Sequence, residues 1–450
     1  MSKLLIELKQ HTPIIQFQGE QKDAVLRGTE IKPKLDKFLI KHEFKNDFQK
    51  YEKFLIGYKS ENEKDYKDKK ALNYKLRVKV RSEGKPIDIG YNRYPFYFND
   101  INSSDTNKFI LYTNKVDCRK SFGKKVVKNI KGKIYIEVFS LHAELIEAIK
   151  TWIPKFFIIN NFGFRQNKGY GSFTVEKINS KNISINNPIN LISEMYPDKG
   201  IYYIEYNGAN WKRIMDDCTI IYQIMKSGIN FGGNYEKSFL FRYLKGKEIG
   251  NEKRFIKEKF FGIKEDANDK CQRYVRAVLG VCKENIYRNI SDDSNSRKNK
   301  KDITKIYYKT NEENESLNVE RYSSPIFFKI IGNRLFIFSK EIYYKSVEYK
   351  KSESIYNKSF MLSDKKINMT KDKKKEDENI YYIETLSEDQ FNMEDFLKEY
   401  FKYFNTMITI RNDKDNFRNK YKLNIPKDKV IELGRVKDEW IYRVDHRTNC

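Results

Sequence analysis

Cysteine and histidine are scarce in this chain, with five and four residues respectively among 450. The cysteines are odd in number and show no Cys-x-x-Cys spacing: Cys118, Cys218, Cys271, Cys282 and Cys450. This pattern excludes a disulfide framework and a cysteine zinc site, and it is typical of reduced cytoplasmic thiols. We therefore predict neither a metal nor another cofactor, and we expect a cytoplasmic protein.

Long hydrophobic runs are also missing. No stretch approaches the length of a membrane span, and residues 1–9 are interrupted by charge too early for a signal peptide. No Ser/His/Asp set, metal-ligand cluster or Walker loop can be defended, because Asp216-Asp217 and Asp292-Asp293 lack organised companions. These absences favour a soluble protein without a membrane partner and without a catalytic role.

Acidic residues are too few to balance the basic ones. Lys and Arg total 88 against 62 Asp and Glu, which gives a formal net charge of +26. Such a surplus indicates a polyanionic partner, nucleic acid before anionic membrane. A/T-biased codons would also raise the content of Lys, Asn, Ile and Tyr without any ligand. That bias gives no reason, however, for the basic residues to exceed the acids so far.

Three glycines and two cations stand close together before the middle of the chain: Gly163, Arg165, Lys168, Gly169 and Gly171. Glycine permits positive φ and has no side chain, so backbone N–H groups can approach an anion closely. The two cations can neutralise phosphates. The stretch therefore predicts a loop that grips a phosphate backbone. The alternative is a glycine hairpin with two solvated cations.

A helix is predicted before this glycine loop and a strand after it. The helix presents one apolar face, formed by Leu141, Leu145, Ile149, Trp152 and Phe156. Ser140 is placed to cap its start, and only Pro154 disturbs its later turns. Beyond the loop, residues 173–176 alternate between apolar and polar, which predicts a half-buried strand that anchors the loop to a sheet.

A second phosphate site is predicted where a helix begins near residue 30. Its apolar face consists of Ile31, Leu35, Phe38 and Leu39. Thr29 is a plausible cap, and Pro33 is acceptable in a first turn. Arg27 and Gly28 precede this helix N-terminus, Lys32 and Lys34 follow, and such a terminus attracts phosphate. The alternative is an amphipathic helix with ordinary solvated lysines.

The order of the predicted elements indicates the fold class. A strand at 4–8, which the run 14–17 continues or pairs with, begins a series that reads β-α-β-β-α-β up to the glycine loop and its strand. A similar order follows, with strand 201–206, helix 211–225, hairpin 325–338 and a last helix near 396–404.

We therefore predict an α+β protein with two ferredoxin-like (RRM-like) β-α-β-β-α-β units and charged insertions. The N-terminal domain would cover residues 1–180 and the C-terminal domain residues 200–450. Polar, cationic composition predicts disordered insertions near 291–319 and 345–379.

Taken together, these motifs resemble the RAMP superfamily of CRISPR proteins, whose members have ferredoxin-like folds and a loop of the form Gly-x-Gly-x5-Gly-x-Gly or a reduced version. Here that loop is 162–171, while Thr12-Pro13 and residues 26–35 look like the family's opening strand and helix start. Residues 321–329 look like the Ser-Pro strand of a second repeat. The chain departs from the family at Pro33 and Lys34, and only one glycine precedes the five-residue spacer.

Within the superfamily, a helix carrying Trp152 that runs into the glycine loop is most similar to the first-numbered RAMP subunit of type III-B (Cmr) complexes. The resemblance implies a non-catalytic subunit that binds crRNA and target RNA near the 3′ end of the guide, together with other Cmr subunits. The predicted RNA-binding residues are Arg27, Gly28, Lys32, Lys34, Gly163, Arg165, Lys168, Gly169 and Gly171. The many Tyr and Phe residues suit base stacking on single-stranded RNA.

Other functions are also open. In a crRNA-processing endoribonuclease of this superfamily, His11 or His42 would be the general base on a ribose 2′-OH. Such enzymes usually carry the glycine loop near the C-terminus, whereas 450 minus 171 leaves 279 residues after Gly171. Target cleavage by a loop aspartate would use Asp23. A structural RNA-binding protein outside CRISPR is a further alternative.

Overall fold

The computed structural model describes residues 2–15, 26–59, 66–80, 85–87, 127–129, 133–183, 187–208, 211–231, 234–262, 271–281, 284–288, 303–310, 323–340, 344–345, 352–353, 355–363, 380–412 and 415–434. The chain divides into two compact units. Unit 1 comprises Met1–Met215, Phe328–Ile337 and Glu432–Cys450, and unit 2 comprises Asp216–Phe327 and Phe338–Ile431. The domain boundaries given above remain a prediction.

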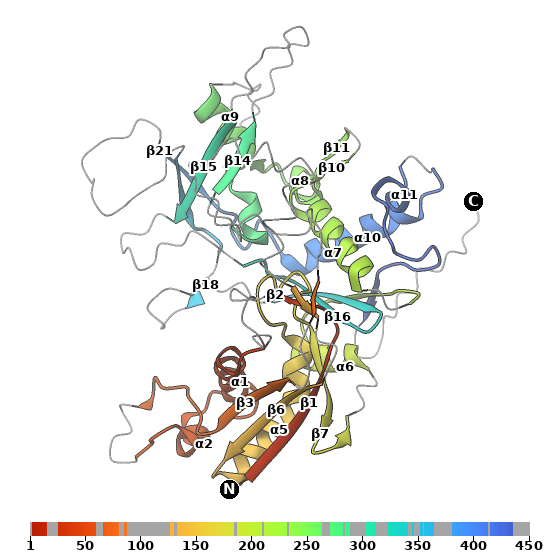
Figure 1. Ribbon diagram of the computed structural model, residues 1–450. Coiled ribbons are helices and arrows are strands. Elements are labelled where there is room, and N and C mark those ends of the chain that lie inside the picture. The colour runs from red at the N-terminus through yellow and green to blue at the C-terminus, as the bar shows by residue number, and fades with distance from the viewer. Residues whose placement is uncertain are drawn as a thin grey trace. The chain divides into compact units, whose positions relative to one another are not determined.

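The first sheet of unit 1 has the strand order β3-β6-β1-β7-β8, with all neighbours antiparallel (Figure 1). The first four strands and two helices follow the β-α-β-β-α-β order, and strand order 4-1-3-2 results, as in ferredoxin-like folds. The elements are β1 Ser2–Gln10, α1 Gly28–His42, β3 Lys75–Val80, β6 Ile134–Ser140, α5 Ala143–Ile159, β7 Phe173–Ile178 and the short β8 Lys181–Asn182.

Alternation along the strands decides which face of this sheet is buried. In β1, Leu4, Ile6 and Leu8 are buried, as are their partners on β6, and α5 packs against β1, β6 and β7. An antiparallel sheet can bury one face in this way and leave the other solvated. Helices α1 and α5 meet through aromatic residues, with Phe38 edge-on to Phe156. The core of unit 1 therefore lies between the sheet and these two helices.

The second predicted β-α-β-β-α-β series is found in the sheet with the strand order β16-β17-β9-β22. Along the chain its elements are β9 Ile201–Glu205, α7 Trp211–Lys226, β16 Ile326–Ile331, β17 Arg334–Ser339, α10 Met393–Thr409 and β22 Glu432–Gly434. This is again the β-α-β-β-α-β sequence with order 4-1-3-2. The predicted hairpin turns at Gly332, which has φ +61°, and the predicted apolar face of the last helix is buried. The α+β fold class is confirmed.

The remaining elements form small sheets and short helices. In unit 1 they are β2 Ile14–Ile15, α2 Phe48–Tyr51, the 3-10 helix Glu52–Phe54, β4 Lys85–Ile87, β5 Val127–Asn129 and α6 Pro188–Met195. In unit 2 they are β10 Ile229–Phe231, β11 Asn234–Glu236, α8 Phe239–Lys245, β12 Gly250–Asn251, α9 Glu252–Phe261, β13 Gln272–Arg273, the 3-10 helix Val275–Leu279, β14 Glu284–Arg288, β15 Ile303–Thr310, β18 Tyr344–Lys345, β19 Ser352–Glu353, β20 Ser359–Ser363, β21 Ile380–Glu384 and α11 Phe417–Tyr421. Within the described residues, no helix is long and apolar enough to cross a membrane.

Several local predictions are wrong. Ile14 and Ile15 neither continue nor pair with β1, because they pair with β5 in a separate sheet. Helix α1 begins at Gly28, so its N-cap is Arg27 rather than Thr29, and Pro33 lies inside the helix. Leu141 precedes α5 and is 78% exposed, so it does not face the core.

The prediction of disorder also fails for part of the two insertions. Strand β15 lies within residues 291–319 and β20 within residues 345–379, and the two pair with each other in the sheet β14-β15-β20-β21. In β20 the four consecutive residues from Phe360 to Ser363 are buried. Long-range pairing thus orders segments whose neighbours in sequence are dominated by charge.

Candidate nucleic-acid interface

The glycine loop connects α5 to β7 and is held by the segment that follows β1. The N–H of Gly171 donates to the carbonyl oxygen of Pro13 at 2.8 Å, and the N–H of Phe164 donates to that of Ile15 at 2.8 Å. The Thr12 hydroxyl donates to the carbonyl of Gly169 at 2.6 Å and accepts from the N–H of Ser172 at 2.9 Å. The structure therefore brings two predicted motifs together, the Thr12-Pro13 segment and the glycine loop.

All three loop glycines have the positive φ predicted for them, at +79° for Gly163, +90° for Gly169 and +67° for Gly171. Each also sits where a side chain would collide with the protein. A Cβ on Gly171 would lie 1.8 Å from the carbonyl oxygen of Phe162, and one on Gly163 would lie 2.5 Å from that of Ile15. Packing of the loop on its own unit therefore requires glycine at both positions.

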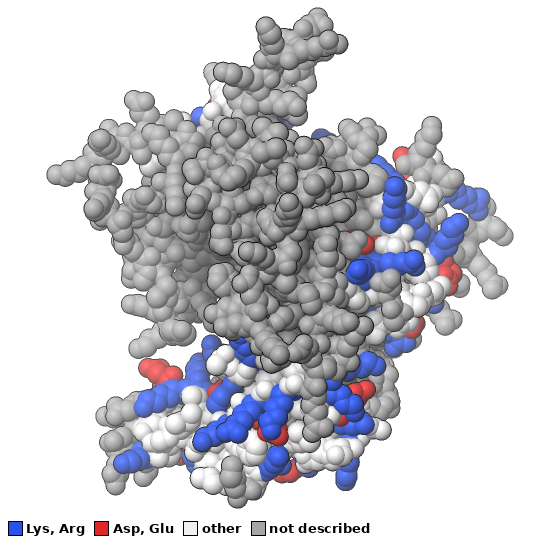
Figure 2. All heavy atoms as spheres, viewed as in Figure 1, with Lys and Arg blue, Asp and Glu red and all other residues white. Residues whose placement is uncertain are grey.

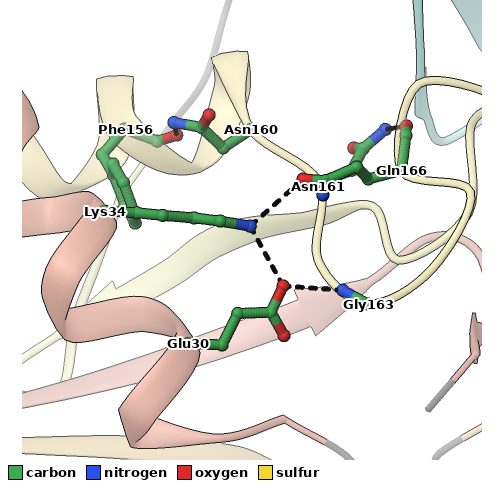
Figure 3. A network of polar contacts seen from close by, with 7 residues as sticks. All are labelled: Glu30, Lys34, Phe156, Asn160, Asn161, Gly163 and Gln166. Carbon is green, nitrogen blue, oxygen red and sulfur yellow. Dashed lines mark hydrogen bonds and ion pairs between the residues drawn. The ribbon is translucent and has the colours of Figure 1, made fainter. Parts of the chain in front are cut away.

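The N–H groups of these glycines donate to protein acceptors. Gly169 donates to the carbonyl of Gln166 at 3.3 Å, and Gly171 donates to Pro13. Gly163 instead donates to a carboxylate oxygen of Glu30 at 2.8 Å (Figure 3). The anion at the N–H of Gly163 is thus a carboxylate of α1, and the predicted contact of the loop with phosphate stays a prediction.

Glu30 also joins this loop to a lysine of α1. The same Glu30 oxygen accepts from the Lys34 ammonium at 3.0 Å, and that ammonium donates to the side-chain oxygen of Gln166 at 3.1 Å. It also lies 5.0 Å from the ring centroid of Phe162. The sequence analysis did not include Glu30 among the site residues. Its spacing of four residues from Lys34 could have indicated an ion pair between them.

Lys32 and Lys34, predicted to act together, point to different parts of the unit. Successive helical residues are rotated by about 100°, so positions two apart lie on opposite sides of the helix. Lys32 donates to Asp36 at 2.8 Å and to the carbonyl of Leu72 at 2.8 Å, and it lies over Tyr74. Arg27 is the N-cap of α1 and has an extended backbone, so helical spacing does not relate its side chain to Lys34.

The two loop cations differ in their surroundings. Arg165 is half-buried in a left-handed conformation with φ +55°, and its guanidinium lies 5.7 Å from the Tyr170 ring. Burial lowers the pKa of this guanidinium below its ordinary value. The ammonium nitrogen of Lys168 is buried, and its backbone forms a parallel bridge with Phe328. Both residues are therefore half-buried, and the nitrogen of the Lys168 ammonium is itself buried.

The chain matches the model of the Cmr1 N-terminal domain over residues 1–229 and that of the Cmr1 C-terminal domain over residues 235–423. The chain belongs to the Cmr1 family. The predicted RAMP superfamily subunit, most similar to the first-numbered RAMP subunit of type III-B complexes, is thereby confirmed.

Among solved structures, Cmr1 from Pyrococcus furiosus in its apo form is similar at 11% identity and a TM-score of 0.33. The match covers 78% of this chain and 92% of that chain. A structure described as an RAMP protein binding different RNA substrates matches at 11% identity and a TM-score of 0.20, over 75% of this chain and 88% of the other. No curated protein matches the chain.

A buried lysine of this Cmr1-family chain supports the glycine loop from β16. The Lys329 side chain is fully buried, and its ammonium donates to the carbonyl oxygens of Phe157 at 2.7 Å, Asn160 at 2.9 Å and Phe173 at 3.0 Å. It also donates to the side-chain oxygen of Asn161 at 3.2 Å. Carbonyls at the end of α5 lack helical donors, and a lysine there satisfies them. From the sequence, Lys329 is predicted only to lie in an apolar strand, and its buried role is not indicated.

In this Cmr1-family chain, the two histidines considered as general bases, His11 and His42, are held by contacts with other residues of the protein. The Nδ1 atom of His11 accepts from the N–H of Gly332 at 3.0 Å, so Nε2 carries the proton and donates to the Thr174 hydroxyl at 2.8 Å. Burial, with the charges of Lys329 and Lys9, lowers the pKa of His11 to about 3. His42 packs between Phe38 and Trp152, and burial lowers its pKa to about 4. Asp23 lies outside the described residues.

Within the same described residues, no group of three or more His, Cys, Asp or Glu side chains is arranged to hold a metal ion. Asp217, which the sequence left without a companion, is buried and accepts from the backbone N–H of Asn424 at 2.9 Å. Its partner lies 207 residues away in the sequence, so no local pattern could indicate it.

Proposed function

We propose that this Cmr1-family chain binds crRNA and target RNA within a Cmr ribonucleoprotein, near the 3′ portion of the guide. The observation that carries the proposal is the contact of α1 with the glycine loop, where Lys34 of the helix donates to Gln166 of the loop and Arg165 lies in the same loop. Family membership and the net charge of +26 support the same conclusion.

Arg27, Lys34 and Arg165 are proposed to contact phosphates directly. Lys32 and Lys168 instead stabilise their elements, since Lys32 binds Asp36 and the Lys168 ammonium is buried. The glycines Gly28, Gly163, Gly169 and Gly171 act by permitting close packing. A Cβ on Gly28, for example, would meet the carbonyl oxygen of Leu76 at 3.1 Å.

The carboxylate of Glu30 occupies the position that the sequence pattern assigns to a phosphate. It forms an ion pair with Lys34 and accepts a hydrogen bond from the N–H of Gly163. A bound phosphate would therefore compete with Glu30 for Lys34. Removing the Glu30 charge is expected to strengthen RNA binding, whereas removing a cation weakens it.

The experiment is a salt titration of single-stranded RNA binding to the full chain. Each lost phosphate contact should reduce the slope of log K against log salt by about 0.7. Arg27→Ala and Arg165→Ala should each lower the slope, and Glu30→Gln should raise the affinity. Lys41→Ala removes an exposed charge from the far end of α1 and serves as the matched control. An unchanged slope in folded Arg27→Ala and Arg165→Ala variants would remove the assignment.

The placement near the 3′ part of the guide has its own test. Deleting this subunit from the complex should weaken capture of target RNA that pairs with the 3′ part of the guide and leave binding of the 5′ tag intact. Crosslinking of this chain mainly to the 5′ tag would contradict the placement. Ribosomal or mixed RNA in the purified protein, in place of short guides, would favour an RNA-binding role outside CRISPR.

A further inference from the structure

The first sheet of unit 1 has a second face, turned away from α1 and α5. In β1 the buried Leu4, Ile6 and Leu8 face the helices, so the residues between them lie on the opposite side. The antiparallel register extends this face across three strands. We call it the outer face; it comprises Lys3, Leu5, Glu7 and Lys9 of β1, Lys75, Arg77 and Lys79 of β3, and Lys133, Tyr135, Glu137 and Phe139 in and before β6.

The outer face carries more positive than negative charge. Its six cations are Lys3, Lys9, Lys75, Arg77, Lys79 and Lys133, and its two acids are Glu7 and Glu137, so the excess is four positive charges. Figure 2 shows lysine and arginine atoms gathered over the lower part of the view, where Figure 1 has β3, β6 and β1. This excess is complementary to a polyanion.

The two acids lie beneath the lysines that neutralise them. Glu137 is 8% exposed and forms ion pairs with Lys79 at 2.9 Å and Lys3 at 3.7 Å. Glu7 is 7% exposed and pairs with Lys133 at 2.8 Å. The side chains of these three lysines are more than half exposed. A ligand approaching the face therefore meets ammonium groups before carboxylates.

Two partly exposed aromatic rings lie among these cations on the strand at the centre of the face. Phe139 stands opposite Lys3 on β1 and Lys75 on β3, and Tyr135 stands opposite Lys79. The Lys3 ammonium lies 5.4 Å from the centroid of the Phe139 ring. Four residues of one strand span about 13 Å, so the two rings can hold two separate bases. Aromatic rings interleaved with cations are the usual surface for single-stranded RNA.

We propose that the outer face binds single-stranded RNA, with bases stacked on Tyr135 and Phe139 and phosphates on Lys75 and Arg77. This surface is separate from the glycine loop and extends the proposed RNA-binding function, on which it rests. An acidic protein segment would use the cations but would not need the two rings. Loss of binding on removal of the rings therefore separates the two kinds of partner.

The test measures binding of the full chain to a labelled 15-nucleotide oligouridylate and to an RNA duplex of equal length. The paired change Tyr135→Leu and Phe139→Leu keeps apolar bulk and removes stacking. It should weaken binding of the single strand about tenfold at an unchanged salt slope. The paired change Lys75→Gln and Arg77→Gln should reduce the slope by about 1.4. Lys41→Gln with Lys150→Gln removes two exposed charges from α1 and α5 and is the matched control.

The outcomes separate this proposal from the glycine-loop site. If Arg27→Ala and Arg165→Ala weaken binding while both outer-face variants bind like the control, the outer face is not an RNA surface and the loop assignment stands. If only the outer-face variants weaken binding, the outer face stands and the loop assignment fails. Equal loss for single strand and duplex in the leucine variant would exclude base stacking. Absence of RNA binding by the unaltered chain would remove both. Thermal unfolding of each variant checks that it is folded.

Discussion

In unit 1, the charge of Lys329 is buried, and none of the four oxygen atoms that accept from its ammonium belongs to a carboxylate. A buried ammonium is costly unless every donor is used, and here carbonyl oxygens of α5 and β7 use them. The lysine thereby ties β16 to both ends of the glycine loop. Its contribution is structural, because the buried ammonium contacts only the protein's own oxygen atoms.

Replacing Lys329 by Met should destabilise the protein strongly. The methionine removes the hydrogen bonds to these buried oxygen atoms, and we expect a loss of about 3 kcal/mol in unfolding free energy. Urea denaturation measures it. Lys9→Met, which removes an exposed lysine of β1, should change the unfolding free energy by less than about 0.5 kcal/mol. Similar values for the two variants would contradict the structural role of Lys329.

His11 should make stability depend on pH. Its pKa is lowered from 6.5 to about 3 in the folded protein, so the unfolded chain binds a proton first as the pH falls. The stabilisation is present above pH 6.5 and is lost as the pH falls toward 3, by roughly 1.4 kcal/mol per pH unit for one proton. Urea unfolding at stepped pH should show a slope that is smaller by this amount in His11→Gln than in the unaltered chain, while His42, whose pKa is lowered to about 4, keeps its own contribution in both. Two parallel curves would contradict the buried, neutral His11.

At the scale of elements, the glycine loop is fixed by space as well as by backbone conformation. Gly171→Ala adds a Cβ 1.8 Å from a carbonyl oxygen at a φ of +67°, whereas Gly332→Ala meets nothing within 4 Å at +61°. We expect Gly332→Ala to cost about 1 kcal/mol from left-handed strain alone, and Gly171→Ala about 3 kcal/mol or more. Thermal unfolding of the two variants separates the steric clash of the added Cβ from the backbone strain. Equal losses of unfolding free energy would show that the clash is unimportant.

The helices and strands themselves follow closely from local patterns. The buried faces of α1 and α10 are those that the apolar spacing predicts, because a helix that packs on a sheet must repeat its contacts every three or four residues. Helix starts were less accurate: Ser140 and Thr29 both have capping side chains, yet His142 and Arg27 are the N-caps. Cap position depends on where the preceding chain turns, which spacing alone does not encode.

At the scale of the whole molecule, we expect the chain to hold RNA without cleaving it. His11 uses both ring nitrogens in hydrogen bonds to the protein, so it has no lone pair with which to accept a proton from a ribose hydroxyl. The purified chain, incubated with labelled repeat RNA or guide-matched target RNA, should leave both intact with or without a divalent metal. Discrete cleavage that disappears in His11→Ala or Asp23→Ala would contradict this expectation.

Periodicity and composition by themselves determined the first β-α-β-β-α-β series, the second series up to its last helix, the hairpin around Gly332 and the net charge, because each depends on residues close together in the chain or on their number. The final strand of the second series, β22, was not predicted. Tertiary structure decided what the cations do. Lys32 and Lys34 separate only when Leu72 and Gln166 are brought to α1, and Lys329 finds acceptors more than 150 residues away. The anion beside Gly163 is likewise Glu30, 133 residues distant. Such partners are set by packing of the sheet and helices, and no local pattern carries that information.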